Sequence, residues 1–128
     1  MKLLLDTHAL LWFAIGDSRM PIPIRKIIAD PAHAIWVSPA SHWEIAIKIS
    51  VGKYVLPTPF IEFLNEAVQG NGFEYLPVTT THTEMVATMP FHHRDPFDRL
   101  MVAQALVEDM EMVSADGVLD QYSVTRHW

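Results

Sequence analysis

The sequence predicts one α/β domain, a three-layer α/β/α sandwich around a mostly parallel central sheet. Short apolar runs, each too short for a helix, alternate along the chain with segments of helical periodicity. Strands joined by helical crossovers form parallel sheets that are covered on both faces. The 128 residues are the size of one domain, and 50% hydrophobic with 19% charged residues argues against disorder. No linker or repeat interrupts the pattern, so residues 1–128 are expected to form a single domain.

Proline and glycine mark the ends of the expected elements in the first half of the chain. Pro21 and Pro39 suit first helical turns, and Ser38 is a suitable N-cap before Pro39. Gly16 and Gly52 follow helical patterns and are expected to end them. In order, the expected elements are a strand Lys2–Asp6, a helix Thr7–Ile15, a helix Pro21–Ala29, a strand Ala34–Val37 and a helix from Ser38–Pro39 to Gly52.

The second half continues the alternation. The helix opened by Thr58–Pro59 carries an apolar stripe that is expected to face the core. The helix that begins at Pro96 is apolar almost all round, which is typical of a buried helix. In order, the expected elements are a helix from Thr58–Pro59 to Gly70, a strand Phe73–Val78 weakened by Pro77, a helix Thr81–Thr88, a helix Pro96–Asp109, a strand Met110–Ser114, one helical turn Val118–Tyr122 and a strand Ser123–His127.

Composition excludes several classes of protein. The chain has no cysteine, which excludes disulfides, thiolate zinc sites, iron–sulfur clusters and a cysteine nucleophile. Nine Lys and Arg against 15 Asp and Glu give a net charge of −6, so any nucleic acid must be bound by a local basic rim or by metal ions. No apolar run approaches the ~20 residues of a membrane-spanning helix, and the N-terminus lacks a signal-peptide pattern. We therefore expect no membrane association and a cytoplasmic location.

Four acidic residues are candidates for one site. Asp6 and Asp116 follow two expected strands, and in parallel sheets ligands bind beyond the carboxyl ends of the strands. Asp98 lies in the first turn of the buried Pro96 helix, and Glu44 lies in the helix opened by Ser38–Pro39. Crowded carboxylates repel one another, and a divalent cation removes the conflict. Oxygen ligands without cysteine favour Mg²⁺ or Mn²⁺, which can activate water and neutralise a phosphate during hydrolysis.

Each acid also has a purely structural interpretation. Asp6 is a suitable N-cap, and Glu44 precedes Lys48 by four residues, as in many exposed ion pairs. Asp98 complements the helix dipole, and Asp116 begins an Asp-Gly turn pair. The residues alone support Asp6 and Asp116 best and Glu44 least.

Four motifs in order resemble the PIN domain family, and most closely its bacterial VapC-type toxin branch. They are Leu3–Trp12 (LLLDTHALLW), Ser38–Ile45 (SPASHWEI), His93–Leu100 (HRDPFDRL) with Ala103–Ala105, and Ser114–Asp116. The resemblance covers essentially the whole chain. It implies a metal-dependent ribonuclease in which Asp6, Glu44, Asp98 and Asp116 line one acidic pocket. It also implies Mg²⁺ or Mn²⁺ as cofactor, RNA as substrate, a homodimer and a VapB-type antitoxin as partner.

Several assignments stay open at this stage. Asp95 competes with Asp98 for the third position of the pocket, and Asp120 competes with Asp116 for the fourth. Pro96 favours a helix that begins beside it, which places Asp95 at the N-cap and Asp98 on the inward face. We therefore assign Asp98 to the pocket. Residues that can orient the pocket acids without holding the metal are Thr7, Asp95, Ser114 and Asp120.

A basic rim is expected beside the acids. His92, His93, Arg94 and Arg99 surround Asp98 in sequence, and Lys48 extends the set if its helix borders the pocket. These side chains are candidates for contacts to RNA phosphates, although a solvated loop explains them equally well. Adjacent histidines point apart, so no histidine metal site is expected. If the apolar stripe of the Thr58–Pro59 helix stays partly exposed, it is a candidate groove for the antitoxin.

Two other functions compete with the nuclease hypothesis. A strand that ends in Asp also suits a phosphatase with Asp6 as nucleophile. That class usually has a second acid two residues later, where this chain has His8. A PIN-like module that binds a partner without cleaving is the other alternative. All four acids are present, which argues against a module that has lost its activity.

Overall fold

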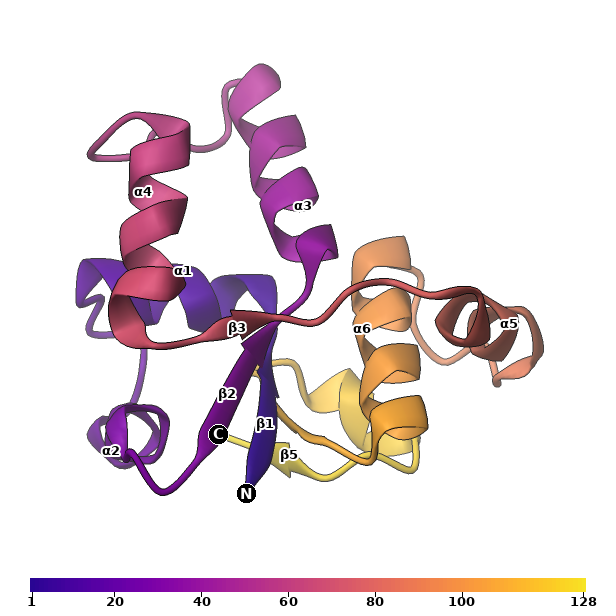
Figure 1. Ribbon diagram of the computed structural model, residues 1–128. Coiled ribbons are helices and arrows are strands. Elements are labelled where there is room, and N and C mark those ends of the chain that lie inside the picture. Colours follow the sequence, from indigo (N-terminus) through magenta and orange to yellow (C-terminus); the bar gives the residue numbers. More distant parts are fainter.

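Five parallel strands form the central sheet in the computed structural model, which describes residues 1–128. The strand order is β3-β2-β1-β4-β5, and every neighbouring pair is parallel (Figure 1). The strands are β1 (Lys2–Leu5), β2 (Ala34–Val37), β3 (Glu74–Tyr75), β4 (Glu111–Val113) and β5 (Arg126–His127). The expected parallel sheet is confirmed, and each strand lies within its expected segment.

Six α-helices and two short 3₁₀ helices connect the strands. They are α1 (Thr7–Ile15), α2 (Ile22–Ala29), α3 (Pro39–Ser50), α4 (Phe60–Ala67), η1 (Gln69–Asn71), α5 (Thr80–Thr88), α6 (Pro96–Glu108) and η2 (Gly117–Gln121). Gly16 ends α1 with a positive φ of 69°, as expected. β3 is shorter than the Phe73–Val78 segment expected for it, because Pro77 has no N–H for a sheet hydrogen bond.

The side chains of β1 build a core on both faces of the sheet. Leu3 and Leu5 pack with the buried side chains of α1, α2 and α4, whereas Leu4 packs with those of α6. Alternate residues of a strand point to opposite faces, so one short strand serves both layers. In Figure 1, α1, α2 and α4 lie on one side of the sheet, and α5 and α6 lie on the other. The expected three-layer α/β/α sandwich is therefore confirmed.

The three central strands end at the same level, which creates the edge where the site lies. Leu5 of β1 is in register with Val37 of β2 and with Val113 of β4. The residues that follow these ends, Asp6 and Ser114 among them, therefore share one edge of the sheet. This is the carboxyl edge at which parallel sheets bind ligands.

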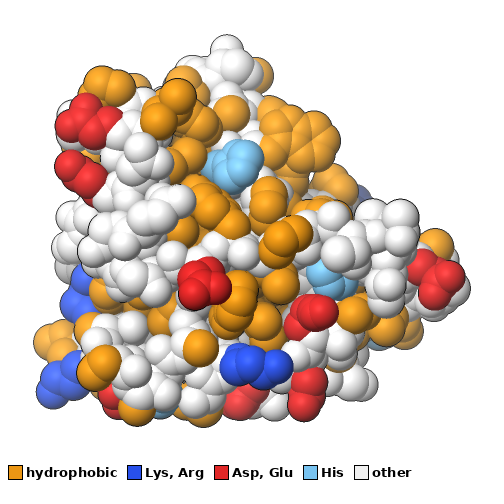
Figure 2. Space-filling model, viewed as in Figure 1, with side chains coloured by type: hydrophobic (Ala, Val, Ile, Leu, Met, Phe, Trp, Pro, Cys, Tyr) orange, Lys and Arg blue, Asp and Glu red, His pale blue; other side chains and the backbone are white.

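Hydrophobic surface is exposed on α3 rather than on the stripe of α4. Phe63, Leu64 and Ala67 of α4 are buried in the core and Phe60 is half-buried, so little of the stripe stays exposed. Trp43 of α3 is 61% exposed, and Ile47 and Val51 are exposed one and two turns further along. Figure 2 shows hydrophobic side chains gathered on the face that carries α3, α4 and β3. No helix of the chain combines the length and the apolar character that crossing a membrane requires.

Candidate metal centre

A cavity of about 390 Å³ opens at the carboxyl edge of the sheet, and all but one of its ten lining residues are polar or charged. It is lined by Asp6, Thr7, His8, Glu44, Lys48, His93, Asp95, Asp98, Ala115 and Asp116. The structure therefore brings together all four acids expected in the pocket, although they come from four different parts of the chain. It also brings in His93 and His8, which sequence reasoning did not place there.

Asp6 lies at the base of the cavity and also caps a helix. Its Oδ1 accepts a hydrogen bond of 2.8 Å from the amide of Ala9 in the first turn of α1. Only 5% of the residue is exposed. Burial raises the pKa of the Asp6 carboxyl, against the opposing effect of hydrogen bonds from the Ser114 side chain and the Ala9 amide. The Asp6 side chain therefore both caps α1 and lines the cavity.

Glu44 is held in the cavity from two sides. The Thr7 hydroxyl donates a hydrogen bond of 2.6 Å to Glu44 Oε1. Lys48 Nζ lies 3.4 Å from Glu44 Oε2, one turn along α3. The expected ion pair between Glu44 and Lys48 exists, but Glu44 is buried and the pair forms part of the cavity wall.

Asp95 and Asp98 divide two tasks at the start of α6. Asp95 Oδ1 caps the helix by accepting hydrogen bonds from the amides of Phe97 (2.8 Å) and Asp98 (3.0 Å). The predicted N-cap is confirmed. Burial, followed by the charges of Asp95 and Asp6, raises the pKa of Asp98 to about 7. The Asp98 side chain is only 20% exposed, which fits this shift.

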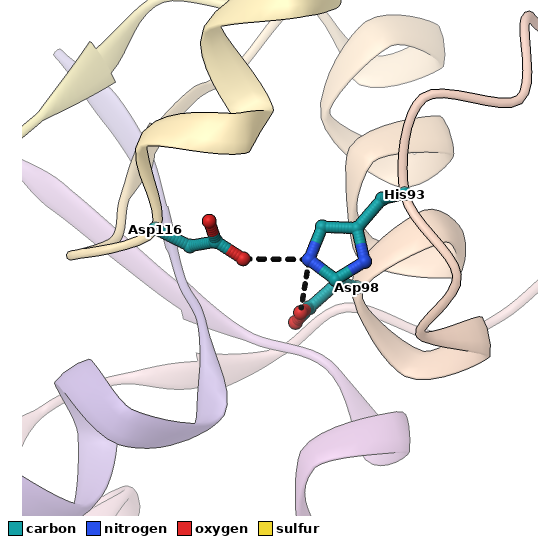
Figure 3. A group of neighbouring side chains, drawn as sticks. All are labelled: His93, Asp98 and Asp116. Atoms are coloured by element: carbon teal, nitrogen blue, oxygen red, sulfur yellow. Dashed lines mark hydrogen bonds and ion pairs between the residues drawn. The ribbon is translucent and has the colours of Figure 1, made fainter.

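Asp116 and His93 meet on the other wall of the cavity (Figure 3). His93 Nε2 lies 2.6 Å from Asp116 Oδ2 and 3.2 Å from Asp98 Oδ2. Burial alone would raise the pKa of Asp116, but hydrogen bonds from His93 and the Val118 amide outweigh it and hold the pKa below its usual value. His93 is therefore a wall residue of the acidic cavity rather than part of an outer rim.

The structure separates Asp116 from its competitor Asp120. Asp120 forms two hydrogen bonds with Arg126, of 2.8 and 2.9 Å, at the surface and does not line the cavity. Asp116 does line it. Ser114 is completely buried, and its hydroxyl accepts a hydrogen bond of 3.0 Å from the Asp116 amide. The Ser114 side chain also lowers the pKa of Asp6, so it acts on both acids that follow β1 and β4.

The expected basic rim is smaller than the sequence indicates. Arg99 is buried, and its guanidinium donates to the carbonyls of Pro90 (3.0 Å) and Val86 (3.1 Å) and to the Tyr122 hydroxyl (3.2 Å). The interpretation of Arg99 as an RNA contact is therefore wrong, because its donors are used inside the protein. Arg94 and His92 remain exposed beside the cavity.

The chemistry of the cavity fits a hard divalent cation. The cavity gathers five carboxylates, and Lys48 is its only Lys or Arg. Burial raises the pKa values of Asp6 and Asp98, and neighbouring carboxylates add to the effect, so a bound cation would favour the charged forms of both acids. Carboxylate and hydroxyl oxygens are the ligands that Mg²⁺ and Mn²⁺ prefer.

The sequence matches the PIN domain family model over residues 3–124. The chain belongs to the PIN domain family. Comparison with curated proteins gave no match. In this PIN domain the four acids expected in the pocket come from four elements: Asp6 follows β1, Glu44 lies in α3, Asp98 lies in the first turn of α6, and Asp116 follows β4.

Solved structures similar to this PIN domain share its fold over nearly the whole chain. One is a chain of VapBC2 from Rickettsia felis, bound to a DNA fragment from its promoter, with a TM-score of 0.71 and 11% identity over 99% of this chain and 98% of that chain. Another belongs to FitAB bound to an IR36 DNA fragment, with a TM-score of 0.62 and 15% identity over 98% and 93%. A third belongs to FitAcB from Neisseria gonorrhoeae, with a TM-score of 0.61 and 16% identity over 98% and 96%.

Proposed function

We propose that this PIN domain is a metal-dependent endoribonuclease that acts as the toxin of a toxin–antitoxin pair. The observation that carries the proposal is the convergence of Asp6, Glu44, Asp98 and Asp116 on one cavity at the carboxyl edge of a parallel sheet. A cluster of this kind is a suitable site for divalent cations that assist phosphodiester hydrolysis. Membership of the PIN family supports the same reaction.

Asp6, Glu44, Asp98 and Asp116 are the residues that would hold Mg²⁺ or Mn²⁺. When bound, the ion would lower the pKa of water and neutralise charge on the scissile phosphate. The protein fixes the acids beforehand: Thr7 holds Glu44, and Ser114 contacts both Asp6 and the Asp116 amide. Asp98 must lose its proton to act as a ligand, which its pKa of about 7 permits near neutral pH.

RNA is the substrate that we propose for this cavity. With a net charge of −6, the chain cannot attract a polyanion by its overall charge. Local cations must therefore orient the backbone, and the structure offers Lys48 in the cavity wall with Arg94 and His92 exposed nearby. These three remain from the expected set of five phosphate contacts, because Arg99 is buried and His93 lies in the cavity wall beside Asp98 and Asp116.

A VapB-type antitoxin and a second copy of the chain are the proposed protein partners. The similar folds come from VapBC2 and FitAB, each bound to a DNA fragment, and from FitAcB. The exposed apolar side chains of α3, Trp43 and Ile47, together with Val51 beyond its end, offer a surface suited to protein contact. The proposed place of action is the cytoplasm, where the RNA substrate is abundant.

A cleavage assay on the full chain tests the proposal. Protein stripped with EDTA is incubated with mixed RNA, with and without Mn²⁺ or Mg²⁺, beside an Asp6→Asn control. Asn caps helices about as well as Asp, so this variant should stay folded. Cleavage that needs metal and is lost in Asp6→Asn supports the nuclease. Folded protein that binds Mn²⁺ but leaves RNA intact would favour the silent PIN module, and hydrolysis of p-nitrophenyl phosphate alone would favour the phosphatase.

A further inference from the structure

His93 is in the position of a metal ligand but carries its hydrogen on the wrong nitrogen for that task. Ligand atoms of His93, Asp98 and Asp116 all lie within 4.8 Å of one another, so distance alone would allow the three to hold a metal ion. The imidazole has a second nitrogen, Nδ1, whose surroundings decide what Nε2 can do. A neutral imidazole has one N–H donor and one nitrogen acceptor, and a metal binds only the acceptor.

The main chain fixes the tautomer of this ring. The backbone N–H of Asp95 points at His93 Nδ1 over 3.0 Å. A backbone amide only donates, so Nδ1 must be the acceptor, and the single hydrogen of neutral His93 lies on Nε2. This assignment follows from the hydrogen-bond network. Nε2 therefore donates to Asp116 Oδ2 at 2.6 Å and faces Asp98 Oδ2 at 3.2 Å.

The loop that carries His93 is itself anchored, so the ring has little freedom to change partners. The hydroxyl of Tyr122 accepts hydrogen bonds from the amides of His92 (3.1 Å) and His93 (3.0 Å). Tyr122 is buried, and its hydroxyl also contacts the buried Arg99. Asp95 stays in place because it caps α6. Binding a metal through Nε2 would require the hydrogen to move to Nδ1, where it would oppose the Asp95 N–H.

We propose that His93 is a positioning residue that holds Asp116 through a neutral Nε2–H donor and is not a metal ligand. This inference rests on the proposed metal site. Within the group formed by His93, Asp98 and Asp116, this leaves only carboxylate oxygens as ligands, which favours hard cations over those that prefer imidazole nitrogen. Asp95 then has two roles: its backbone amide selects the tautomer of His93, and its carboxylate caps α6.

Nuclear magnetic resonance of ¹⁵N-labelled protein tests the tautomer without any activity measurement. Long-range proton–nitrogen correlation spectra show which imidazole nitrogen carries the hydrogen. The signals of His93, one of seven histidines, are assigned by their loss in His93→Gln. We expect the Nε2–H form in metal-free protein and after Mg²⁺ is added. A Nδ1–H form in either state would overturn the proposal.

Pulsed electron paramagnetic resonance of bound Mn²⁺ supplies a second, independent readout. An imidazole that coordinates Mn²⁺ gives a ¹⁴N coupling. We expect the ¹⁴N couplings of the wild type and of His93→Gln to be the same. A coupling present in the wild type and absent from that variant would overturn the proposal. Protein that binds no Mn²⁺ at all would contradict the proposed function instead, and the tautomer in metal-free protein would still decide the role of His93.

Matched variants separate positioning from ligation. His93→Gln retains an N–H donor at a similar reach, whereas His93→Leu removes it. Loss of a group that orients a ligand typically lowers metal affinity about 10- to 100-fold. We expect calorimetry to show that His93→Leu lowers the affinities for Mg²⁺, Mn²⁺ and Zn²⁺ by the same factor. His93→Gln should retain most of the wild-type affinity for each ion. A selective loss of Zn²⁺ affinity in both variants would show that His93 is a ligand.

Discussion

Thr7 donates a hydrogen bond of 2.6 Å to Glu44, a residue 37 positions later in the chain. Both side chains are buried, and the bond ties the first turn of α1 to the middle of α3. Thr7 directly follows Asp6, so the same turn that presents one pocket acid also orients another. Two of the four carboxylates are therefore positioned together by adjacent residues at the end of β1.

Replacement of Thr7 by Val should destabilise the protein and weaken metal binding. Valine keeps the shape but leaves the buried Glu44 Oε1 without its donor, and hydrogen bonds to charged groups contribute about 1.5–3 kcal/mol. Urea unfolding should show a loss of that order. Thr7→Ser, which retains the hydroxyl, is the matched control. Equal stability of Thr7→Val and wild type would mean that the bond does not hold Glu44.

Asp98 and Asp95 should respond differently to the same substitution. Asp98→Asn removes a charge that the proposed metal needs, so RNA cleavage should fall about 100-fold or more, the order of loss when one group that stabilises transition-state charge is removed. Asp95→Asn preserves the cap of α6, since Asn caps as well as Asp, and should retain most of the activity. The two variants are compared by their cleavage rates on one defined RNA, after circular dichroism has shown that both are folded. The reverse order of activities would assign the pocket position to Asp95.

Local rules are sufficient to predict a parallel sheet, the succession of strands and helices along the chain, and several site residues. Apolar runs and crossover helices indicated a parallel sheet, and the acids that follow β1 and β4 were placed at its carboxyl edge for that reason. Pro96 correctly placed Asp95 at the N-cap, because proline favours the first turn of a helix. Each of these inferences depends on a few neighbouring residues.

Side chains whose role depends on distant contacts could not be placed from the sequence. Glu44 has a local partner in Lys48, so nothing nearby reveals that Thr7 also holds it. The positions of His93 and Arg99 depend on the path of the loop before α6, which Tyr122 anchors from about 30 residues away. A histidine two residues before an N-cap Asp was the one available signal, because such a ring can accept the free cap amide.

Without metal, the protein should lose stability as the pH rises from 5 to 8. The folded-state pKa of Asp98 is raised to about 7, and that of Asp6 is raised as well. A carboxyl with a raised pKa stabilises the fold fully below the unfolded-state pKa of 3.8, and this contribution is lost as the pH rises through the folded-state pKa. The acids with lowered pKa values titrate below this window. Unfolding in EDTA at each pH measures the slope.

Asp98→Asn isolates the contribution of that one group. At 1.36 kcal/mol per pH unit, the wild type should lose at most about 3 kcal/mol more than the variant between pH 5 and pH 8. Part of this is screened, since the side chain is 20% exposed. Mg²⁺ at millimolar concentration should restore stability to the wild type at pH 8 and do so less in the variant. Parallel pH profiles of the two proteins would contradict the prediction.

Arg99 and Arg94 should separate folding from RNA binding, although they lie five residues apart. Arg99 is buried, and its guanidinium donates hydrogen bonds to two carbonyls and a hydroxyl. Arg99→Met should leave these acceptors without a donor and lower the free energy of unfolding by about 2–4 kcal/mol. Arg94 is exposed, so Arg94→Gln should leave the free energy of unfolding within about 0.5 kcal/mol. It should instead weaken the binding of RNA and flatten its salt dependence, because one phosphate contact is lost. Urea unfolding and binding of a labelled RNA to the Asp6→Asn background measure the two effects. If a folded Arg99→Lys protein loses RNA affinity while Arg94→Gln keeps it, Arg99 rather than Arg94 contacts the RNA.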